Sequence, residues 1–234
     1  MRAVASSGNS STPDHLFESL LSHRSSCRAF LSDPIPQPLI ERILVLAQRT
    51  ASWCNAQPWQ VSIFSPRATD ALRNELLQYV QHHQPCPDLT WPESYPGVYL
   101  ERRRASGFQL YEAAGVDRND KAAAERQRIE NFRFFGAPHV AIISTQKELG
   151  VYGAVDCGAY VSNFCLAARS LKIDSIPQAA LAAYPEFWRA RLNLGPDRLI
   201  VCGIAFGYGD QAAPANQYRT ARANISEVAH WIDT

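Results

Sequence analysis

The side chains best suited to bind a ligand lie in two short polar stretches near the start of the chain. In the first, Arg24–Phe30, two guanidinium groups stand four residues apart with small hydroxyls between them. Arginine presents a rigid fork of N–H donors that matches the oxygens of a phosphate. In the second, Ser52–Trp59, the amides of Asn55 and Gln57 occupy a loop that ends at Pro58. Together the two stretches predict a site for a ligand that is anionic at one end and a flat, polar heterocycle at the other.

Each stretch, taken alone, also has an interpretation without a ligand. An exposed basic loop would equally contain Arg24, Ser26 and Arg28, and an Asn-x-Gln-Pro sequence is frequent in turns. Near the C-terminus, Arg219 and Arg222 alone would indicate a solvated face. Flavin mononucleotide (FMN), however, needs cations and hydroxyls at its phosphate, donors at its N1–C2=O edge and open space beside N5. The combination of these residues therefore favours FMN.

The bulk composition is that of an ordinary globular protein. The chain has 234 residues, of which 46% are apolar and 19% are charged, and its formal net charge is +1. This balance gives no support for binding to nucleic acid or to an anionic membrane. No apolar run approaches the roughly 18 residues of a membrane-spanning helix. Residues 1–12 are polar and Ser-rich, so we read no secretory signal and expect a disordered lead followed by one domain over 13–234.

The cysteines and histidines show no metal-binding pattern. Six cysteines occur without a Cys-x-x-Cys pair, at positions 27, 54, 86, 157, 165 and 202. Their spacing favours buried free thiols in a reducing compartment, which predicts a cytoplasmic protein. His82, His83 and His230 have no acidic or cysteine partner at ligand spacing, so no metal is assigned.

Apolar periodicity predicts the elements that position these residues. Strands are expected at 59–64, 139–144, 173–176 (ending at Pro177) and 199–206. The wholly apolar last strand is typical of a sheet centre. Helices are expected at 13–23, 40–47, 69–83, 101–133 (in two pieces), 151–171 and 184–193. Because helices and strands mix without a regular β–α–β alternation, the pattern indicates a layered α+β domain.

The order of these motifs resembles the nitroreductase family of flavin enzymes over residues 15–234. That family shows an early Arg-x-Ser-x-Arg/Lys-x-Phe segment, a Pro-rich stretch with an amphipathic helix, a Ser-x-x-Asn-x-Gln-Pro-Trp loop, a mid-chain entry into a strand, a later Pro-containing stretch, and an arginine followed by a short hydrophobic helix. The corresponding stretches here are Arg24–Phe30, Pro34–Ala47, Ser52–Trp59, Phe134–Pro138, Ile176–Ala180 and Arg219–Arg222. The resemblance is specific because all of them occur in the family's order.

The resemblance implies a fold and an assembly. We expect an α+β domain with a central mixed, mainly antiparallel sheet flanked by helices, in an intertwined homodimer with two FMN molecules at the interface. The small residues of the helix expected at 151–171 suit a close two-fold contact. An excursion of helices and loops is expected over 85–133. Its aromatic-rich segment 85–111, which contains Trp91, Tyr95, Phe108 and Tyr111, is expected to form a lid over the substrate.

The resemblance also implies which residues bind the cofactor. Contacts with the phosphate, the ribityl chain or the pyrimidine edge are expected from Arg24, Ser25, Ser26 and Arg28. The flavin of the partner subunit would be reached by Ser52, Trp53, Asn55 and Gln57. The ring would lie along Pro177, Gln178 and Ala179, and the phosphate would also be held by Arg222 with support from Arg219. Asn131 and Arg133 are candidates for the N1–C2=O edge, although an ordinary helical surface explains them equally well.

The activity implied is that of an FMN-dependent oxidoreductase of ping-pong type. NAD(P)H would pass a hydride to flavin N5 and leave, and a nitroaromatic or quinone would take its place. No side chain is assigned a catalytic role; where some members carry a glutamate beside N5, this chain has Ala179, which leaves only a backbone donor there. No Gly-x-Gly-x-x-Gly sequence follows a strand, which argues against a separate dinucleotide-binding domain.

Other functions stay open at this point. The same scaffold serves reductive dehalogenation and flavin breakdown, and a flavin-binding protein without turnover would carry the same cofactor residues. The run Arg102-Arg103-Arg104 is interpreted as a solvated helix face, with recognition of a nicotinamide nucleotide's phosphate as the alternative.

Overall fold

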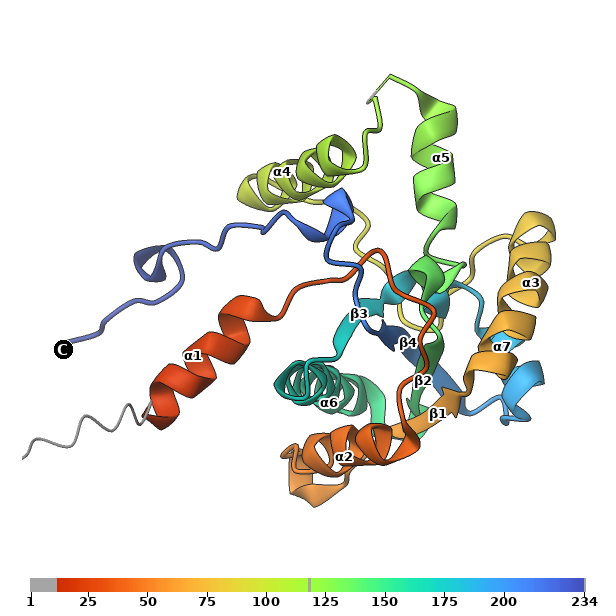
Figure 1. Ribbon diagram of the computed structural model, residues 1–234. Helices are drawn as coiled ribbons and strands as arrows, with labels where there is room; N and C mark the ends of the chain where they lie inside the picture. The colour runs from red at the N-terminus through yellow and green to blue at the C-terminus, as the bar shows by residue number, and fades with distance from the viewer. Residues whose placement is uncertain (1–11, 118, 234) are drawn as a thin grey trace, which may run out of the picture.

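The computed structural model of the chain describes residues 12–117 and 119–233 (Figure 1). The disordered lead expected over residues 1–12 lies outside the described residues, apart from Thr12. Thr12 precedes α1 (Pro13–His23), which begins with a proline at its first turn as the Thr-Pro-Asp sequence predicts. α1 ends at His23 and delivers Arg24 into the following loop.

The central sheet has four strands, and each neighbouring pair is antiparallel. In spatial order the strands are β1 (Gln60–Phe64), β2 (His139–Gln146), β4 (Arg198–Gly207) and β3 (Asp174–Gln178). β4 pairs on both sides, which confirms the interior position predicted from its apolar run. Outside the named strands, a parallel bridge joins Ser26 to Ser175. The described sheet is therefore mainly antiparallel, with a small parallel component.

β3 continues past the proline at which the sequence predicts its end. Pro177 lies within the strand, opposite Ile204 of β4, and β3 ends one residue later at Gln178. β3 is the outermost of the four strands beside β4. Proline is tolerated in an edge strand because its missing N–H need not pair with a second neighbour.

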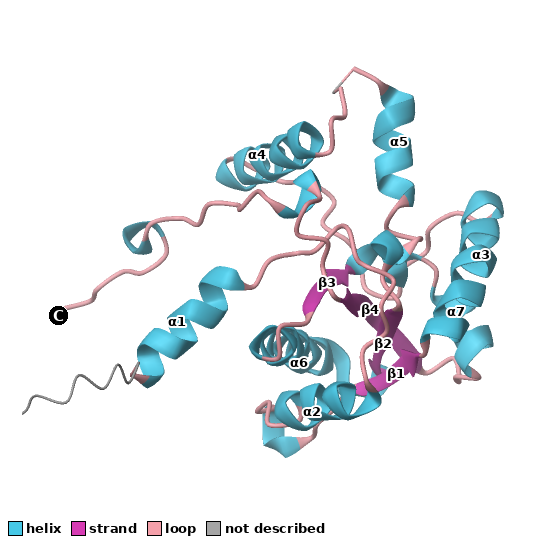
Figure 2. Ribbon diagram, viewed as in Figure 1, coloured by secondary structure: helices cyan, strands magenta, loops and turns pink. Residues whose placement is uncertain are grey.

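Helices cover both faces of the sheet, as Figures 1 and 2 show. One face packs against α2 (Gln37–Ala47) and α6 (Gly150–Ser170). The other packs against α3 (Pro66–His82) and α7 (Pro185–Leu192). α3 begins three residues before the predicted start, because a proline is favourable in the first turn of a helix.

Successive residues of the strands face the two layers of helices in turn. In β2, Val140 and Ile142 belong to the apolar cluster on the side of α3 and α7. Ala141 and Ile143, which alternate with them, belong to the cluster on the side of α2 and α6. All four are at most 1% exposed. A strand with both faces buried must be apolar throughout, which explains why β2 and β4 lack the alternation of a half-exposed strand.

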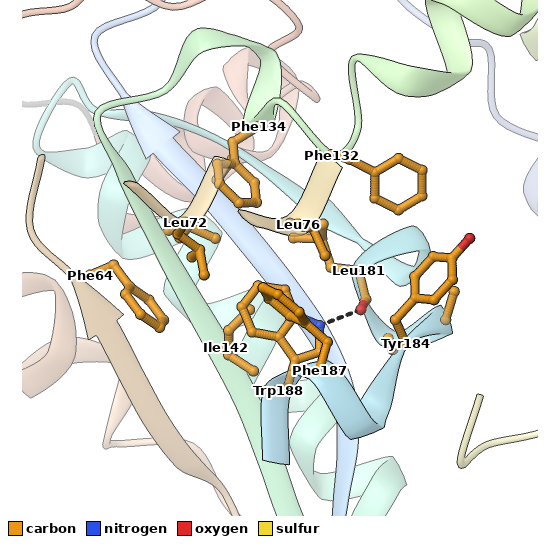
Figure 3. Packing of buried hydrophobic residues seen from close by; sticks show 14 of the residues in the cluster. Phe64, Leu72, Leu76, Phe132, Phe134, Ile142, Leu181, Tyr184, Phe187 and Trp188 are labelled. Carbon is orange, nitrogen blue, oxygen red and sulfur yellow. Dashed lines mark hydrogen bonds between the residues drawn. The ribbon is translucent and has the colours of Figure 1, made fainter. Parts of the chain in front are cut away.

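Trp188 of α7 is fully buried in the cluster shown in Figure 3. Its indole N–H donates a hydrogen bond to the carbonyl of Leu181. Its ring also contacts Phe187 and Phe64, with centroids 5.1 Å and 6.3 Å apart. Because the polar N–H is satisfied inside the core, the tryptophan fills a large volume without an unpaired donor.

Three helices extend away from the sheet (Figure 1). The helical stretch expected over 101–133 forms α4 (Val98–Ala113) and α5 (Lys121–Ile129), which are separated near Gly115 as predicted. Neither of these helices nor α1 contains a buried residue. On α1 the predicted apolar stripe is largely uncovered: Leu16, Phe17 and Leu21 are 50–55% exposed.

The prediction of a short hydrophobic helix after Arg219 is wrong. Among the described residues of the tail, only a 3-10 turn at Ile225–Glu227 follows Arg222. The carbonyls of this stretch accept hydrogen bonds from side chains instead. Arg219 donates to the carbonyls of Asn216 and Tyr218, and Arg222 donates to those of Thr220 and Ala221. Such bonds replace those that a helix would form.

The thiols are free, as the spacing of the cysteines predicts. All six cysteines are free thiols, four of them buried, and only Cys54 and Cys86 are exposed. Burial raises the pKa of Cys202 to about 12, so that thiol stays protonated. Over residues 12–117 and 119–233, we find no helix with the length and apolar character needed to cross a membrane.

Asp88 anchors the Pro-rich segment 85–97 to the sheet. One carboxylate oxygen accepts a hydrogen bond from Arg189 Nη2 at 2.5 Å, and the other accepts from the N–H of Ile200 in β4 at 2.8 Å. The side chains of Asp88 and Arg189 are only 11% and 10% exposed. A buried ion pair is costly to leave half-formed, because the remaining charge lacks a partner.

We expect Asp88→Ala to lower the free energy of unfolding by about 2 kcal/mol, since it removes the buried acceptor of Arg189 and of the Ile200 N–H and leaves Arg189 only its ion pair with the largely exposed Glu186. Urea denaturation followed by circular dichroism measures this change. Asp70→Ala serves as the matched control: Asp70 pairs with Arg73 but is 71% exposed, so the loss there should stay below about 1 kcal/mol. Equal losses in the two variants would contradict the role assigned to Asp88.

Candidate cofactor site

Arginines from opposite ends of the chain line a single cavity of about 530 Å³. Arg24 and Arg28 come from the segment after α1, and Arg219 and Arg222 come from the C-terminal tail. The lining also contains hydroxyl groups, from Ser22, Ser25, Ser26, Ser106, Tyr218 and Thr220. None of the described residues that line this cavity is acidic. We call it the arginine cavity.

The segment 24–31 is held beside the sheet by backbone hydrogen bonds. Ser26 bridges to Ser175 of β3, and the N–H of Cys27 donates to the Ser175 carbonyl at 3.1 Å. This extended course turns alternate residues in opposite directions: Cys27 is buried, whereas Ser26 and Arg28 face the arginine cavity. Burial raises the pKa of the Cys27 thiol to about 12, so it contributes no charge beside the arginines.

The tail reaches the same place along the other side of this segment. Phe30 bridges to Gly209, and the N–H of Leu31 donates to the Tyr208 carbonyl at 2.8 Å. The N–H of Asp210 then donates to the Ala29 carbonyl at 2.9 Å. These bonds start at the end of β4, so the tail leaves the sheet in contact with the segment that carries Arg24 and Arg28.

Three of these arginines are oriented by neutral oxygen atoms. Arg28 donates to the Ser26 carbonyl at 3.3 Å, and its guanidinium lies 5.8 Å from the ring centre of Tyr218. Arg219 and Arg222 donate to carbonyls and one hydroxyl of the tail. A carbonyl dipole orients a guanidinium without neutralising it. The cavity is therefore suited to an anion with several oxygens, such as a phosphate.

A second cavity, of about 330 Å³, adjoins the first because Ser26 and Arg28 line both. Its walls include Phe135, Pro177 and Ala179, which present flat or small surfaces. We call it the flat cavity. α4 and α5 complete it with residues that the sequence did not single out for this site, namely Leu110, Ala124, Gln127 and Arg128. Tyr111, which was expected in the lid, also lines it.

Asn131 and Arg133, the two candidates for the N1–C2=O edge, have different surroundings in the structure. Asn131 lines the flat cavity, whereas Arg133 lines neither cavity and lies 3.6 Å from Glu130. Gln178 is 3% exposed and donates through Nε2 to the Asn131 carbonyl at 2.8 Å. Its side chain therefore ties β3 to the turn after α5. In this stretch Pro177 and Ala179 are the exposed residues.

The Ser52–Gln57 loop lies away from both of these cavities. Asn55 and Gln57 line a different cavity, of about 780 Å³, together with Leu44 and Val45 of α2 and with Gln48, which follows that helix. The described residues of this loop line neither the arginine cavity nor the flat cavity. Figure 1 shows α2 at the opposite end of the molecule from α4. One chain alone thus does not bring the two predicted stretches together, and their meeting across a dimer stays a prediction.

The loop is nevertheless held in a defined shape. Three non-glycine residues have left-handed backbone angles, with φ of 49° at Cys54, 56° at Asn55 and 48° at Gln57, an uncommon conformation that the surroundings must stabilise. The N–H of Gln57 donates to Ser52 Oγ at 2.9 Å, and Gln48 Nε2 donates to Gln57 Oε1 at 2.8 Å.

The remaining sequence candidates have other surroundings. Arg102 pairs with Glu227 at 3.2 Å, and the guanidinium of Arg103 lies 5.0 Å from the ring centre of Tyr95. All three arginines of the 102–104 run are exposed, as expected of a solvated face. Across the part of the chain that the structure describes, no group of three His, Cys, Asp or Glu side chains is placed to hold a metal ion.

Comparison with known proteins places this chain in a family. Residues 21–208 match the family model described as "Nitroreductase family". The chain is 34% identical over 215 residues to nitroreductase NfnB of Mycolicibacterium smegmatis, covering 92% of each protein. It is 30% identical over 218 residues to 4-nitrobenzoate reductase of Pseudomonas putida, covering 92% of this chain and 95% of the relative.

A solved structure is similar over nearly the whole fold. The crystal structure of the FMN-dependent nitroreductase NfnB from Mycobacterium smegmatis in complex with NADPH superposes with a TM-score of 0.90 at 33% identity. The match covers 94% of this chain and all of the other. The family match, the extent of the sequence identity and the shared fold agree with the motif order: this chain belongs to the nitroreductase family.

Proposed function

We propose that this protein is an FMN-dependent oxidoreductase that reduces nitroaromatic compounds with electrons from NAD(P)H. The observation that carries the proposal is the arginine cavity, in which cations from both ends of the chain meet beside a flat cavity. Relatives named for nitroaromatic reduction, and a similar structure described as FMN-dependent and complexed with NADPH, support it.

The residues of the arginine cavity fit the phosphate end of FMN. A phosphate monoester carries about −1.5 to −2 charges at pH 7 and offers three acceptor oxygens. Arg24, Arg28, Arg219 and Arg222 supply donors that stay charged at any physiological pH. The hydroxyls of Ser25 and Ser26 add neutral donors. We propose that these residues hold the phosphate and the ribityl chain.

The flat cavity fits the ring end of the cofactor. Pro177 and Ala179 would lie along the ring, and the amide of Asn131 would face its polar edge. Bound FMN would supply the redox chemistry, accepting a hydride at N5 from NAD(P)H and then reducing an acceptor that takes the same place. Because Ala179 has no acidic side chain, protons would reach the product from water. Residues of α4 and α5, including Tyr111, would exclude bulk water from this space.

We further propose that the working form is a homodimer. Large apolar side chains are exposed on α1, on α6 and in the tail; examples are Phe17, Val151 and Trp231, at 55%, 76% and 90% exposure. Apolar surface of this extent is typical of a protein interface. In that dimer, Ser52, Trp53, Asn55 and Gln57 would contact the flavin of the partner subunit.

The acceptor would be chosen by shape more than by specific contacts. The flat cavity accepts a planar molecule, and among the described residues that line it the charged ones are Arg28 and Arg128. Arg128 is already paired with Glu125 at 2.6 Å. Nitroaromatics are the class named for the relatives, and quinones share the same flat shape. Reductive dehalogenation and flavin breakdown have no separate support in these contacts.

We expect Arg24→Ala to weaken FMN binding roughly ten- to hundredfold, because one charge-assisted contact with phosphate contributes about 1.5–3 kcal/mol. The flavin content of the purified protein and the Kd of the refilled protein measure this change. Arg104→Ala is the matched control, since Arg104 is exposed and lines neither cavity. Full flavin content in Arg24→Ala would argue against the phosphate site, and a flavin that NAD(P)H cannot bleach under nitrogen would argue against the reductase.

The dimer proposal makes a separate prediction about thiols. Cys54 lies in the Ser52–Gln57 loop, and Cys86 lies outside both cavities; both are exposed. We expect FMN to slow the reaction of Cys54 with iodoacetamide severalfold while Cys86 reacts at an unchanged rate. Peptide mass spectrometry of the protein with and without flavin measures both rates. If FMN leaves the Cys54 rate unchanged relative to Cys86, the loop does not face a flavin.

A further inference from the structure

One asparagine connects the two segments that supply the arginines. Asn216 Oδ1 accepts a hydrogen bond from the N–H of Arg28 at 2.7 Å. Its Nδ2 group donates to the carbonyl of Ala29 at 2.9 Å and to that of Asp210 at 2.8 Å. The backbone carbonyl of Asn216 accepts from Arg219 Nη1 at 2.8 Å. A single residue thus contacts one arginine from each end of the chain.

The chemistry of these bonds requires an amide side chain. The oxygen of Asn216 must accept while its nitrogen donates twice, and these three bonds converge from two chain segments. Aspartate has no donor, leucine has neither group, and serine has a single hydroxyl. Asn216 is also half-buried, so its lost partners would not be fully replaced by water.

Asn216 makes the last hydrogen bonds between the tail and the segment 24–31 before the tail reaches Arg219 and Arg222. Upstream, the bridge between Phe30 and Gly209 and the bond from Asp210 to Ala29 hold the tail to residue 210, and Gln211 Nε2 donates to the carboxylate of Asp174 at 3.3 Å. Downstream, the next recorded ion pair of the tail joins Glu227 to Arg102 of α4, beyond Arg222. Since the described tail between these points forms no α-helix, its course past Arg219 depends on the bonds of Asn216 and on the contact of the Tyr218 ring with Arg28.

We infer that Asn216 is a positioning residue for phosphate binding. Its side-chain amide sets the distance between the segment that carries Arg24 and Arg28 and the segment that carries Arg219 and Arg222. It touches no ligand itself, because it is absent from the described lining of both cavities. The inference rests on the proposed function, in which the arginine cavity holds the phosphate of FMN.

Comparing FMN with riboflavin tests this role, because riboflavin has the same ring and ribityl chain but no phosphate. In Asn216→Leu, we expect the Kd for FMN to rise at least roughly tenfold, the equivalent of about 1.4 kcal/mol. The Kd for riboflavin should change less than about twofold, since the lining of the flat cavity apart from Arg28 forms no hydrogen bond with Asn216. Quenching of flavin fluorescence on titration of the flavin-free protein measures both constants.

Asn224→Leu is the matched control. Asn224 lies in the same tail, where its amide caps the turn at Ile225–Glu227, and it lines neither cavity. Its FMN-to-riboflavin ratio should equal that of the unchanged protein. If Asn216→Leu does not fold, Asn216→Ser is the milder variant, and a smaller rise in the FMN constant alone is expected from it.

Epistasis with Arg219 gives a second measurement. If Asn216 acts through Arg219 and its neighbours, Asn216→Leu should weaken FMN binding less in an Arg219→Gln background than in the unchanged protein. Fully additive effects would overturn the inference. Equal losses for FMN and riboflavin would overturn it too, since they would indicate general damage. A protein that binds FMN unaffected by Asn216→Leu refutes only the role of Asn216, whereas an unchanged protein that binds no FMN refutes the proposed function along with it.

Discussion

The structure depends on holding four guanidinium groups together against their mutual repulsion. Like charges that share one cavity repel one another, and the repulsion is strongest where solvent does not screen it. None of the described residues in the lining is an acid that would neutralise them. The scaffold orients the arginines through backbone carbonyls instead. Such a site stays electropositive, which is what a dianionic ligand requires, and the stability of the sheet and its helices must offset the repulsion.

The sheet is arranged to meet this requirement. β2 and β4 are buried on both faces by helices and supply a rigid platform. The site lies beside that platform, where β3 is bridged by the segment after α1 and where the tail leaves β4. Asp174 of β3 reinforces this end by accepting from Arg169 at 3.0 Å and from the N–H of Gly209 at 3.2 Å. Backbone hydrogen bonds thus fix the segments that carry the arginines to the well-packed core.

Much of this arrangement could be predicted from the sequence, because it follows from local patterns. The apolar runs of β2 and β4 and the Thr-Pro start of α1 predict their elements with errors of a few residues. The motif order also led to Arg24, Arg28, Arg219 and Arg222, which the structure places around one cavity. The local sequence could not exclude the helix expected after Arg219. In the structure, arginine side chains donate to the carbonyls of this stretch, and no local pattern predicts such bonds. Gln178 turns inward because of Asn131, a contact across 47 positions, and no short-range pattern reports such a bond.

Because Arg219 and Arg222 come late in the chain, the binding of the cofactor could be lost while the folded core stays intact. The four strands and the buried members of both apolar clusters end before residue 208, whereas half of the arginines around the cavity come after it. A protease that cut the chain in the exposed stretch near Gln217 would leave the core intact while removing those charges. Such a cut would leave a well-folded chain that lacks half of the arginines proposed to hold the cofactor, so that proteolysis could inactivate the protein before it unfolds.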